Sequence, residues 1–153
     1  MPTLDLGHHL AVSVADWSRS SLTASRLLLE PGQATALRLL LDNAGPRADR
    51  ADLVMVFPSG LEPDPASLGT DGGAPAAWDA VGRRLTWQGD LSAGGRVAIH
   101  LRARRDPSAM PPDGDFLLTM VFGDGRGIQY RRDLKLAFPR ARLSLPWLAV
   151  ERR

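Results

Sequence analysis

The three histidines are the first candidates for chemistry, because neutral imidazole is the commonest metal ligand among side chains. His8 and His9 are adjacent, so in an extended chain they point to opposite faces and do not readily meet one metal ion. His100 lies far away in sequence, on the polar face of a predicted strand. A metal site would need acidic residues to join them, so we interpret all three as surface residues.

Several aspartates in turn-rich stretches suggest calcium as an alternative. They are Asp64, Asp71, Asp79, Asp90, Asp113, Asp115 and Asp124. None follows the spaced Asp-x-Asp-x-Asp-Gly pattern with a closing Glu that a calcium loop requires. We read Asp113-Gly114-Asp115 and Gly123-Asp124-Gly125 as turns, and predict no metal.

Nucleophilic catalysis has little support in the sequence. The chain has no cysteine, and Ser59 lies in Pro-Ser-Gly without the Gly-x-Ser-x-Gly elbow. Gly69 to Gly73 is not followed by the Gly-Lys-Ser/Thr of a phosphate-binding loop. A carboxylate pair assembled by loops in three dimensions stays open. We therefore expect a protein that is not an enzyme and carries no cofactor.

Three tryptophans could form an aromatic platform for a sugar or a peptide. Trp87 is interpreted as core between two sheets, and Trp78 as the residue that pins a long loop to the body. Trp147 lies between Pro146 and Leu148, and a rigid aromatic residue near a chain end can anchor a partner. Core packing of Trp147 is the alternative.

The elements that must position these residues are short strands, because apolar residues alternate with polar ones. Alternation is found at Leu10–Ala15, at Leu37, Leu39 and Leu41, and from Val97 to Ala103. A second apolar segment runs from Leu22 to Leu29. The stretch Ala51–Phe57 is apolar on both faces, which predicts a central strand that ends before Pro58.

Turns and loops separate these strands. Pro31-Gly32 and Asn43-Ala44-Gly45-Pro46 predict tight turns on either side of Ala34–Asp42. A short strand is expected at Leu85–Trp87, and a glycine-rich hairpin is expected between 116–122 and 128–138. Residues 62–84 lack periodicity and are predicted to be a long loop. The tail after Phe138 is too apolar for a free linker, so it either adds an edge strand or docks on a partner.

Length and composition fit one soluble-type domain. The chain has 153 residues, 44% of them hydrophobic and 24% charged, with 15 Gly, 12 Pro and no Cys. No stretch approaches a membrane span, and the first residues lack the pattern of a signal peptide. A complete chain then favours the cytoplasm, whereas a segment of a longer protein favours the cell envelope or secretion.

Charge is unevenly distributed along the chain. Residues 1–95 hold seven Arg against eleven acidic residues, whereas residues 96–153 hold eleven Arg and Lys135 against six. A basic half can serve an acidic partner or nucleic acid. Because nucleic-acid binding also needs clustered aromatic residues, it is the weaker interpretation, and an ordinary solvated Arg-rich surface is the simpler one.

Residues 29–61 resemble a family of bacterial immunoglobulin-like conserved-repeat domains of the surface-protein type. The similarity rests on a series of turn and packing signals over about residues 10–106. They are Pro31-Gly32, Asn43-Ala44-Gly45-Pro46, Phe57-Pro58-Ser59-Gly60-Leu61, Gly69-Thr70, Leu85-Thr86-Trp87, Leu91-Ser92-Ala93-Gly94 and Val97 to Ala103. The resemblance implies a β-sandwich with an adhesive, spacer or scaffold role. The Leu- and Arg-rich strands and the extra C-terminal residues depart from the family pattern.

We therefore predict an all-β protein, an immunoglobulin-like antiparallel sandwich of about eight or nine strands over 1–138, with an apolar extension at 139–153. The predicted function is protein docking through a sheet edge, the basic C-terminal half and the tail. The alternative is a carbohydrate-binding or accessory domain that uses the 62–84 loop and tryptophans. The predicted partner-binding residues are Trp147, Leu145, Leu148, Arg140, Arg142, Arg131, Arg132 and Trp78.

Overall fold

The computed structural model describes residues 15–108, 115–124 and 129–137, and all of its regular structure is β-strand. The strands are β1 (Ser21–Ala24), β2 (Ala34–Asp42), β3 (Asp49–Val56), β4 (Leu61–Asp71), β5 (Ala77–Asp79), β6 (Arg84–Leu91), β7 (Arg96–Arg105), β8 (Phe116–Gly123) and β9 (Gln129–Leu136). The predicted strand at Leu10–Ala15 lies almost wholly outside the described residues. The predicted extension at 139–153 lies entirely outside them.

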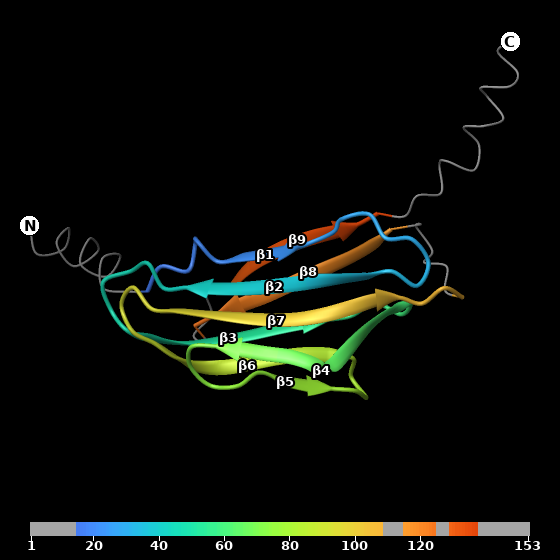
Figure 1. Cartoon of the computed structure of the whole chain (residues 1–153). Coiled ribbons are helices and arrows are strands. Elements are labelled where there is room, and N and C mark those ends of the chain that lie inside the picture. Colours follow the sequence, from blue (N-terminus) through green and yellow to red (C-terminus); the bar gives the residue numbers. More distant parts are fainter. Residues whose placement is uncertain (1–14, 109–114, 125–128, 138–153) are drawn as a thin grey trace, which may run out of the picture.

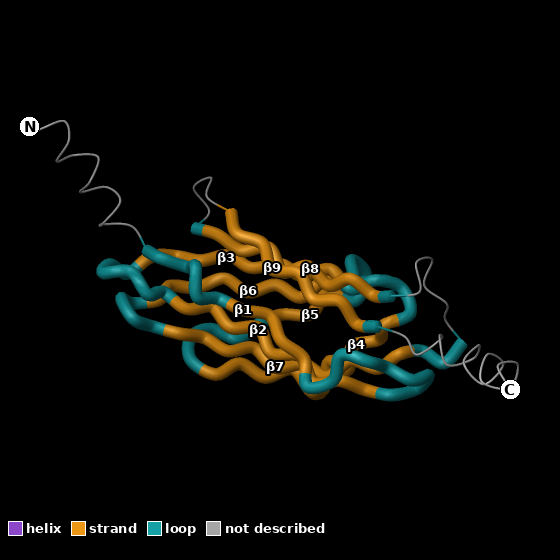
Figure 2. The backbone as a smooth tube through the Cα atoms, turned by 90° about the horizontal axis from the view of Figure 1, so that it is seen from above, coloured by secondary structure: helices purple, strands orange, loops and turns teal. Residues whose placement is uncertain are grey.

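Two antiparallel sheets pack face to face. The four-stranded sheet has the order β1-β2-β7-β4, and the five-stranded sheet has the order β5-β6-β3-β8-β9. Figure 1 shows the first sheet in front of the second, and Figure 2 shows the two layers from above. This arrangement confirms the predicted all-β sandwich. It also places β3 between β6 and β8, as its apolar sequence predicted.

The core lies between the sheets and is made by alternate residues of each strand. Leu37, Leu39 and Leu41 of β2 are fully buried, and β7 buries Val97, Ile99, Leu101 and Ala103 in the same way. Trp87 of β6 is also buried, which confirms its predicted place in the core. Each such side chain stabilises the fold by about 1.5–3 kcal/mol relative to an exposed one.

Asn43 holds one end of the sandwich together. Its side chain is fully buried; the amide nitrogen donates to the carbonyl oxygens of Arg47 (2.8 Å), Leu91 (3.2 Å) and Ser92 (3.2 Å). Its Oδ1 accepts from the N–H groups of Gly45 (3.0 Å) and Asp16 (3.3 Å). The predicted corner after β2 therefore also fixes the turn between β6 and β7 and the segment before β1.

Arg83 fixes the turn between β3 and β4. Its guanidinium donates to the carbonyl oxygens of Phe57 (3.3 Å), Pro58 (2.8 Å) and Leu61 (2.8 Å). It also lies 3.4 Å from a carboxylate oxygen of Glu62. Arg83 has a φ of 51°, unusual for a residue with a side chain, so this contact set holds the backbone in the left-handed region.

The prediction of a loop over 62–84 is wrong. The structure forms β4 and β5 there, and β6 runs on to Leu91 rather than ending at Trp87. β4 contains Pro63 and Pro65, and its register with β7 shifts between Asp64 and Gly69. Proline and a register shift are tolerated because β4 pairs on only one side, and this composition hides the strand from a periodicity argument.

Candidate protein-binding surface

The outer face of the five-stranded sheet carries an unusual apolar stripe on two of its three inner strands, β3 and β8. Val54 and Val56 point outward from β3, and Leu117 and Val121 point outward from β8. Val54 pairs with Val121 in the sheet register. Val56 is 55% exposed and Leu117 is 52% exposed. The outer face of an antiparallel sheet is commonly polar, so this stripe is a candidate contact surface.

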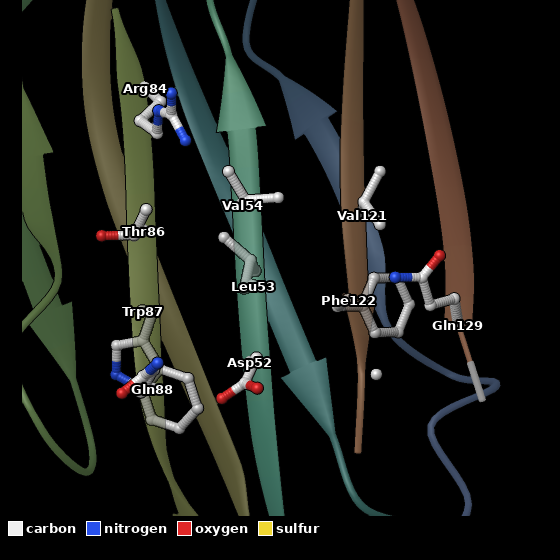
Figure 3. A pocket seen from close by; sticks show the side chains of 11 residues that line it. Asp52, Leu53, Val54, Arg84, Thr86, Trp87, Gln88, Val121, Phe122 and Gln129 are labelled. Atoms are coloured by element: carbon white, nitrogen blue, oxygen red, sulfur yellow. The ribbon is translucent and has the colours of Figure 1, made fainter. Parts of the chain in front are cut away.

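A shallow groove of about 490 Å³ crosses this face at one end of the stripe. Figure 3 shows its labelled side chains on four neighbouring strands, β6, β3, β8 and β9. Its lining combines Val54 and Val121 of the stripe with polar side chains of β3, β6 and β9. The residues are Asp52, Leu53, Val54, Arg84, Thr86, Trp87, Gln88, Val121, Phe122, Gly123 and Gln129.

Edge strand β9 borders the stripe with charged side chains. The predicted residue Arg131 is exposed, and its Nε lies 3.1 Å from Oδ1 of Asp133. The Thr119 hydroxyl donates to the same oxygen at 2.7 Å. These two hydrogen bonds, that of Thr119 first, hold the pKa of Asp133 below its ordinary value. Lys135 is also exposed, so β9 presents a charged rim beside the apolar residues.

Arg132, another predicted contact residue, is engaged within the sandwich. Its Nε donates to the carbonyl oxygen of Ser20 at 3.0 Å, and its Nη2 donates to that of Ser18 at 2.9 Å. The guanidinium also lies over the rings of Phe122 and Tyr130. Arg132 thus joins β9 to the segment before β1. Its role toward a partner stays a prediction.

β9 is an edge strand of the five-stranded sheet, and one bridge, between Leu28 and Ala137, lies just beyond its end. Ala137 donates to the carbonyl oxygen of Leu27 (2.7 Å) and accepts from the N–H of Leu29 (2.9 Å), so its backbone groups face away from β8. Because the direction alternates along a strand, the backbone groups of Arg131, Asp133 and Lys135 face the same way. In the described part of the chain, these three N–H groups meet no backbone acceptor across that edge.

Arg132 limits what this edge can accept. Its Nη1 donates to the carbonyl oxygen of Arg131 at 2.9 Å, which occupies one of the outward-facing acceptors. An inward-pointing charge on an edge strand hinders the addition of another strand. We therefore expect β9 to contribute mainly through the side chains of Arg131, Asp133 and Lys135.

Trp78 lies on β5, at the opposite edge of the same sheet. It is half-buried, and its ring meets that of Phe57 edge to face with centroids 5.4 Å apart. It pins strand β5 to the body, where the sequence predicted that it would pin a loop, and its role toward a partner stays a prediction. Trp87 is buried and its Nε1 donates to the carbonyl oxygen of Ala74 at 2.6 Å, so these two tryptophans do not form a common exposed platform.

The remaining predicted contact residues belong to the tail. Arg140, Arg142, Leu145, Trp147 and Leu148 all lie outside the described residues. Their part in binding remains a prediction. The last described residue before them, Ala137, directly follows β9.

Within the described ranges, no group of three or more His, Asp or Glu side chains could hold a metal ion. His100 is exposed on β7, and its Nε2 lies 3.9 Å from Oδ2 of Asp71. No helix that could span a membrane occurs in the part of the chain described.

Comparisons with known proteins identify the type of fold but no family or function. No family model matches the chain, and no curated protein sequence matches it. Among solved structures, the N-terminal domain of the Streptococcus gordonii adhesin Sgo0707 is similar, with a TM-score of 0.61 and 12% identity. That match covers 79% of this chain but only 32% of the adhesin structure, so the chain spans about a third of it.

Two further structures support the same fold. The collagen-binding subdomain ACE19 of an Enterococcus faecalis surface protein gives a TM-score of 0.52 and 9% identity, covering 78% of this chain and 95% of that one. Domains D2 and D3 of the Corynebacterium diphtheriae pilin SpaD give 0.52 and 7%, covering 76% and 50%. The chain has the β-sandwich fold of bacterial surface adhesin and pilin domains. At such low identity the likeness shows fold alone.

Sequence reasoning missed the outward stripe on β3 and β8. The signal is present in the sequence, because Ala51–Phe57 is apolar on both faces, but the same pattern also predicts a central strand covered on both faces. In a sandwich with one covered face per sheet, an apolar residue on the second face has no neighbouring layer to pack on. The outward residues of β8, Leu117 and Val121, carry the same signal.

Proposed function

We propose that this chain is a non-catalytic protein-binding module whose partner docks on the β8–β9 side of the five-stranded sheet. The observation that carries the proposal is the apolar stripe of Val54, Val56, Leu117 and Val121, bordered by the charged side chains of edge strand β9. An apolar centre with a polar rim is the usual anatomy of a protein interface.

The arrangement supports a division of roles. Burial of Val56 and Leu117, both about half exposed, supplies affinity, because each removes apolar surface from water. Arg131 and Lys135 at the rim favour an acidic partner and set orientation and association rate more than affinity. Residues 139–153, with Trp147 at their centre, extend the contact from the end of β9.

The comparisons support a binding role for this fold without naming a ligand for this chain. One similar structure is described as a collagen-binding subdomain and another as an adhesin domain. The partner of this chain is therefore described only by its chemistry, an acidic protein surface with an apolar centre.

Site-specific photo-cross-linking in the producing cells tests the proposal. A photoreactive residue at position 117 should give one discrete protein adduct, whereas the same residue at position 81 should give none. Val81 is the matched control because it is 97% exposed, apolar and located in the turn between β5 and β6. Absence of an adduct at 117, or identical adducts at both positions, would contradict docking on this face.

Deletion of residues 139–153 tests the contribution of the tail. The deletion should abolish binding to the cross-linked partner while the circular dichroism spectrum of the sandwich is retained. Unchanged affinity would remove the tail from the proposal and leave the sheet face as the binding surface.

A further inference from the structure

The outer face of the four-stranded sheet carries a row of basic side chains. Arg102 and Arg104 point outward from β7, next to His100, and Arg38 points outward from β2 opposite His100. All four side chains are exposed. This face lies on the opposite side of the sandwich from the apolar stripe (Figure 2).

The three arginines of this row differ from the other arginines of the described strands in their contacts. Arg50, Arg84, Arg96 and Arg131 lie within 4 Å of a carboxylate, and Arg105 and Arg132 donate to backbone carbonyl oxygens. Among the described residues, Arg38, Arg102 and Arg104 form neither kind of contact, although Asp106 lies near enough to Arg104 to interact with its charge. Their guanidinium donors are directed to solvent.

The surface beside these arginines is hollowed. Arg102 pairs in register with Ala36 of β2, and Arg104 pairs with Ala34. The short alanine side chains leave two shallow depressions of about 510 and 390 Å³, and Arg102 lines both. The larger depression is lined mainly by β1, β2 and β7, and the smaller one by Ala34, by β7 and by residues 62–65 of β4. We call the two together the track; it follows β7 and reaches β2 on one side and β4 on the other.

Two acidic residues of β4 line the smaller depression together with the arginines. Glu62 and Asp64 of β4 are the register partners of Arg104 and Arg102. Glu62 is turned toward Arg83 at 3.4 Å, and Asp64 accepts the N–H of Ala66 at 3.1 Å. A ligand in the track thus meets positive charge on one side and negative charge on the other.

This charge pattern discriminates between classes of ligand. A uniform polyanion, such as nucleic acid or a sulfated glycan, gains from β7 but is repelled by Glu62 and Asp64. His100 is the one aromatic ring that lines either depression, and no Phe, Tyr or Trp does, so successive bases would have no stacking platform there. A polypeptide can instead place carboxylates only where the arginines are.

Spacing also favours a polypeptide. Alternate residues of a strand lie about 6.6–6.8 Å apart, so Arg102 and Arg104 present their guanidinium groups at the repeat of alternate side chains in an extended peptide. Arginine binds a carboxylate through two parallel hydrogen bonds, so a peptide whose carboxylates have the spacing of the two arginines gains in geometry as well as in charge.

We propose that the track over β2 and β7 binds an extended polypeptide segment with Asp or Glu at every second residue, held by Arg102 and Arg104 and extended toward Arg38. The site is separate from the docking surface on the five-stranded sheet and does not depend on it. Because both surfaces are on one small sandwich, the chain can hold two protein segments on opposite sides.

The experiment uses the full chain and a blocked peptide of four Thr-Glu repeats, followed by two-dimensional amide NMR and calorimetry. Saturable binding should shift the amide signals of Ala36, His100 and Arg102. A peptide with its four Glu residues consecutive should bind more weakly, and one with Lys in place of Glu should not bind. The double variant Arg102→Gln/Arg104→Gln should lose about tenfold or more in affinity.

The matched control is Arg19→Gln/Arg47→Gln, two exposed arginines outside both surfaces, which should keep wild-type affinity and melting temperature. Equal binding to the Arg102→Gln/Arg104→Gln variant, or no preference for alternating Glu, would overturn the proposal. So would tighter binding of a heparin fragment or oligothymidine at the same amides, because that result assigns the track to a polyanion.

Discussion

The two outer faces of the sandwich are made by the same kind of strand but have opposite surface chemistry. β3 and β8 direct Val54, Val56 and Leu117 to solvent, whereas β2 and β7 direct Arg38, Arg102 and Arg104 to solvent. Both sheets bury nearly continuous apolar rows on their inner faces. The inner rows determine the fold, so the outer residues can differ between the sheets without loss of the core. One outer face is apolar and the other is basic, as expected if they contact different partners.

The largest expected effect is on stability, and it distinguishes a core-facing residue of β3 from the outward-facing residue next to it. Met55→Asp should unfold the domain, because a fully buried side chain becomes a carboxylate without a partner. Val56→Asp, one residue along β3, should leave the melting temperature within a few degrees. Thermal unfolding followed by circular dichroism checks both; similar losses in the two variants would show that the outer face is also packed.

Asn43→Ala should destabilise both faces together. It removes hydrogen bonds that join the β2–β3 corner, the β6–β7 turn and the segment before β1, and it leaves buried carbonyl groups without donors. We expect a loss of about 3 kcal/mol in the free energy of unfolding, measured by urea denaturation. Arg47→Ala, whose backbone carbonyl still accepts from Asn43, is the control. Loss of structure in one sheet alone would contradict this shared role.

Arg132→Ala should lower the local stability of edge strand β9, on one side of the five-stranded sheet. Its removal frees β9 from Ser18 and Ser20 and should lower stability by about 1–2 kcal/mol. Hydrogen exchange of the β9 amides should accelerate more than that of β7. The reference variant is Arg104→Ala, which removes an arginine without a partner and should change neither quantity. Equal acceleration in both strands would mean that Arg132 acts on the whole sandwich.

The smallest effect concerns the charged rim of the apolar stripe. Because hydrogen bonds from Thr119 and Arg131 hold the pKa of Asp133 below 3.8, its contribution to stability is present above that value. The contribution is lost as the pH falls through the lower pKa of the folded state. An NMR titration of the Asp133 carboxyl should give a midpoint below 3.8, and Thr119→Val should raise it. A midpoint at or above 3.8 would contradict the hydrogen-bonded rim.

The sequence predicts most of the fold because the information is local. Alternation in β2 and β7, the Pro31-Gly32 turn with its positive φ at Gly32, and the buried Trp87 are all correctly predicted. β4 and β5 were missed because edge strands pair on one side and tolerate proline and register shifts. The contacts of Arg83 and Arg132 join residues far apart in sequence, so no local sequence pattern predicts them.

The candidate surface was only partly predictable for the same reason. The charge of Arg131 points to the rim of this surface, whereas Trp78, predicted from its aromatic character, lies at the opposite edge of the sheet. The stripe instead depends on which strands become neighbours: Val54 meets Val121 only because β8 pairs with β3. Period-two alternation says that two residues share a face but not which strand lies beside them.

The central claim is that the chain binds a protein through the apolar outer face of the five-stranded sheet. Its most direct test is calorimetry with the purified cross-linked partner and the double variant Val56→Asp/Leu117→Asp, compared with Val81→Asp. We predict that the double variant loses at least about tenfold in affinity at an unchanged fold, while Val81→Asp binds like the wild type. Wild-type affinity of the double variant would contradict the claim.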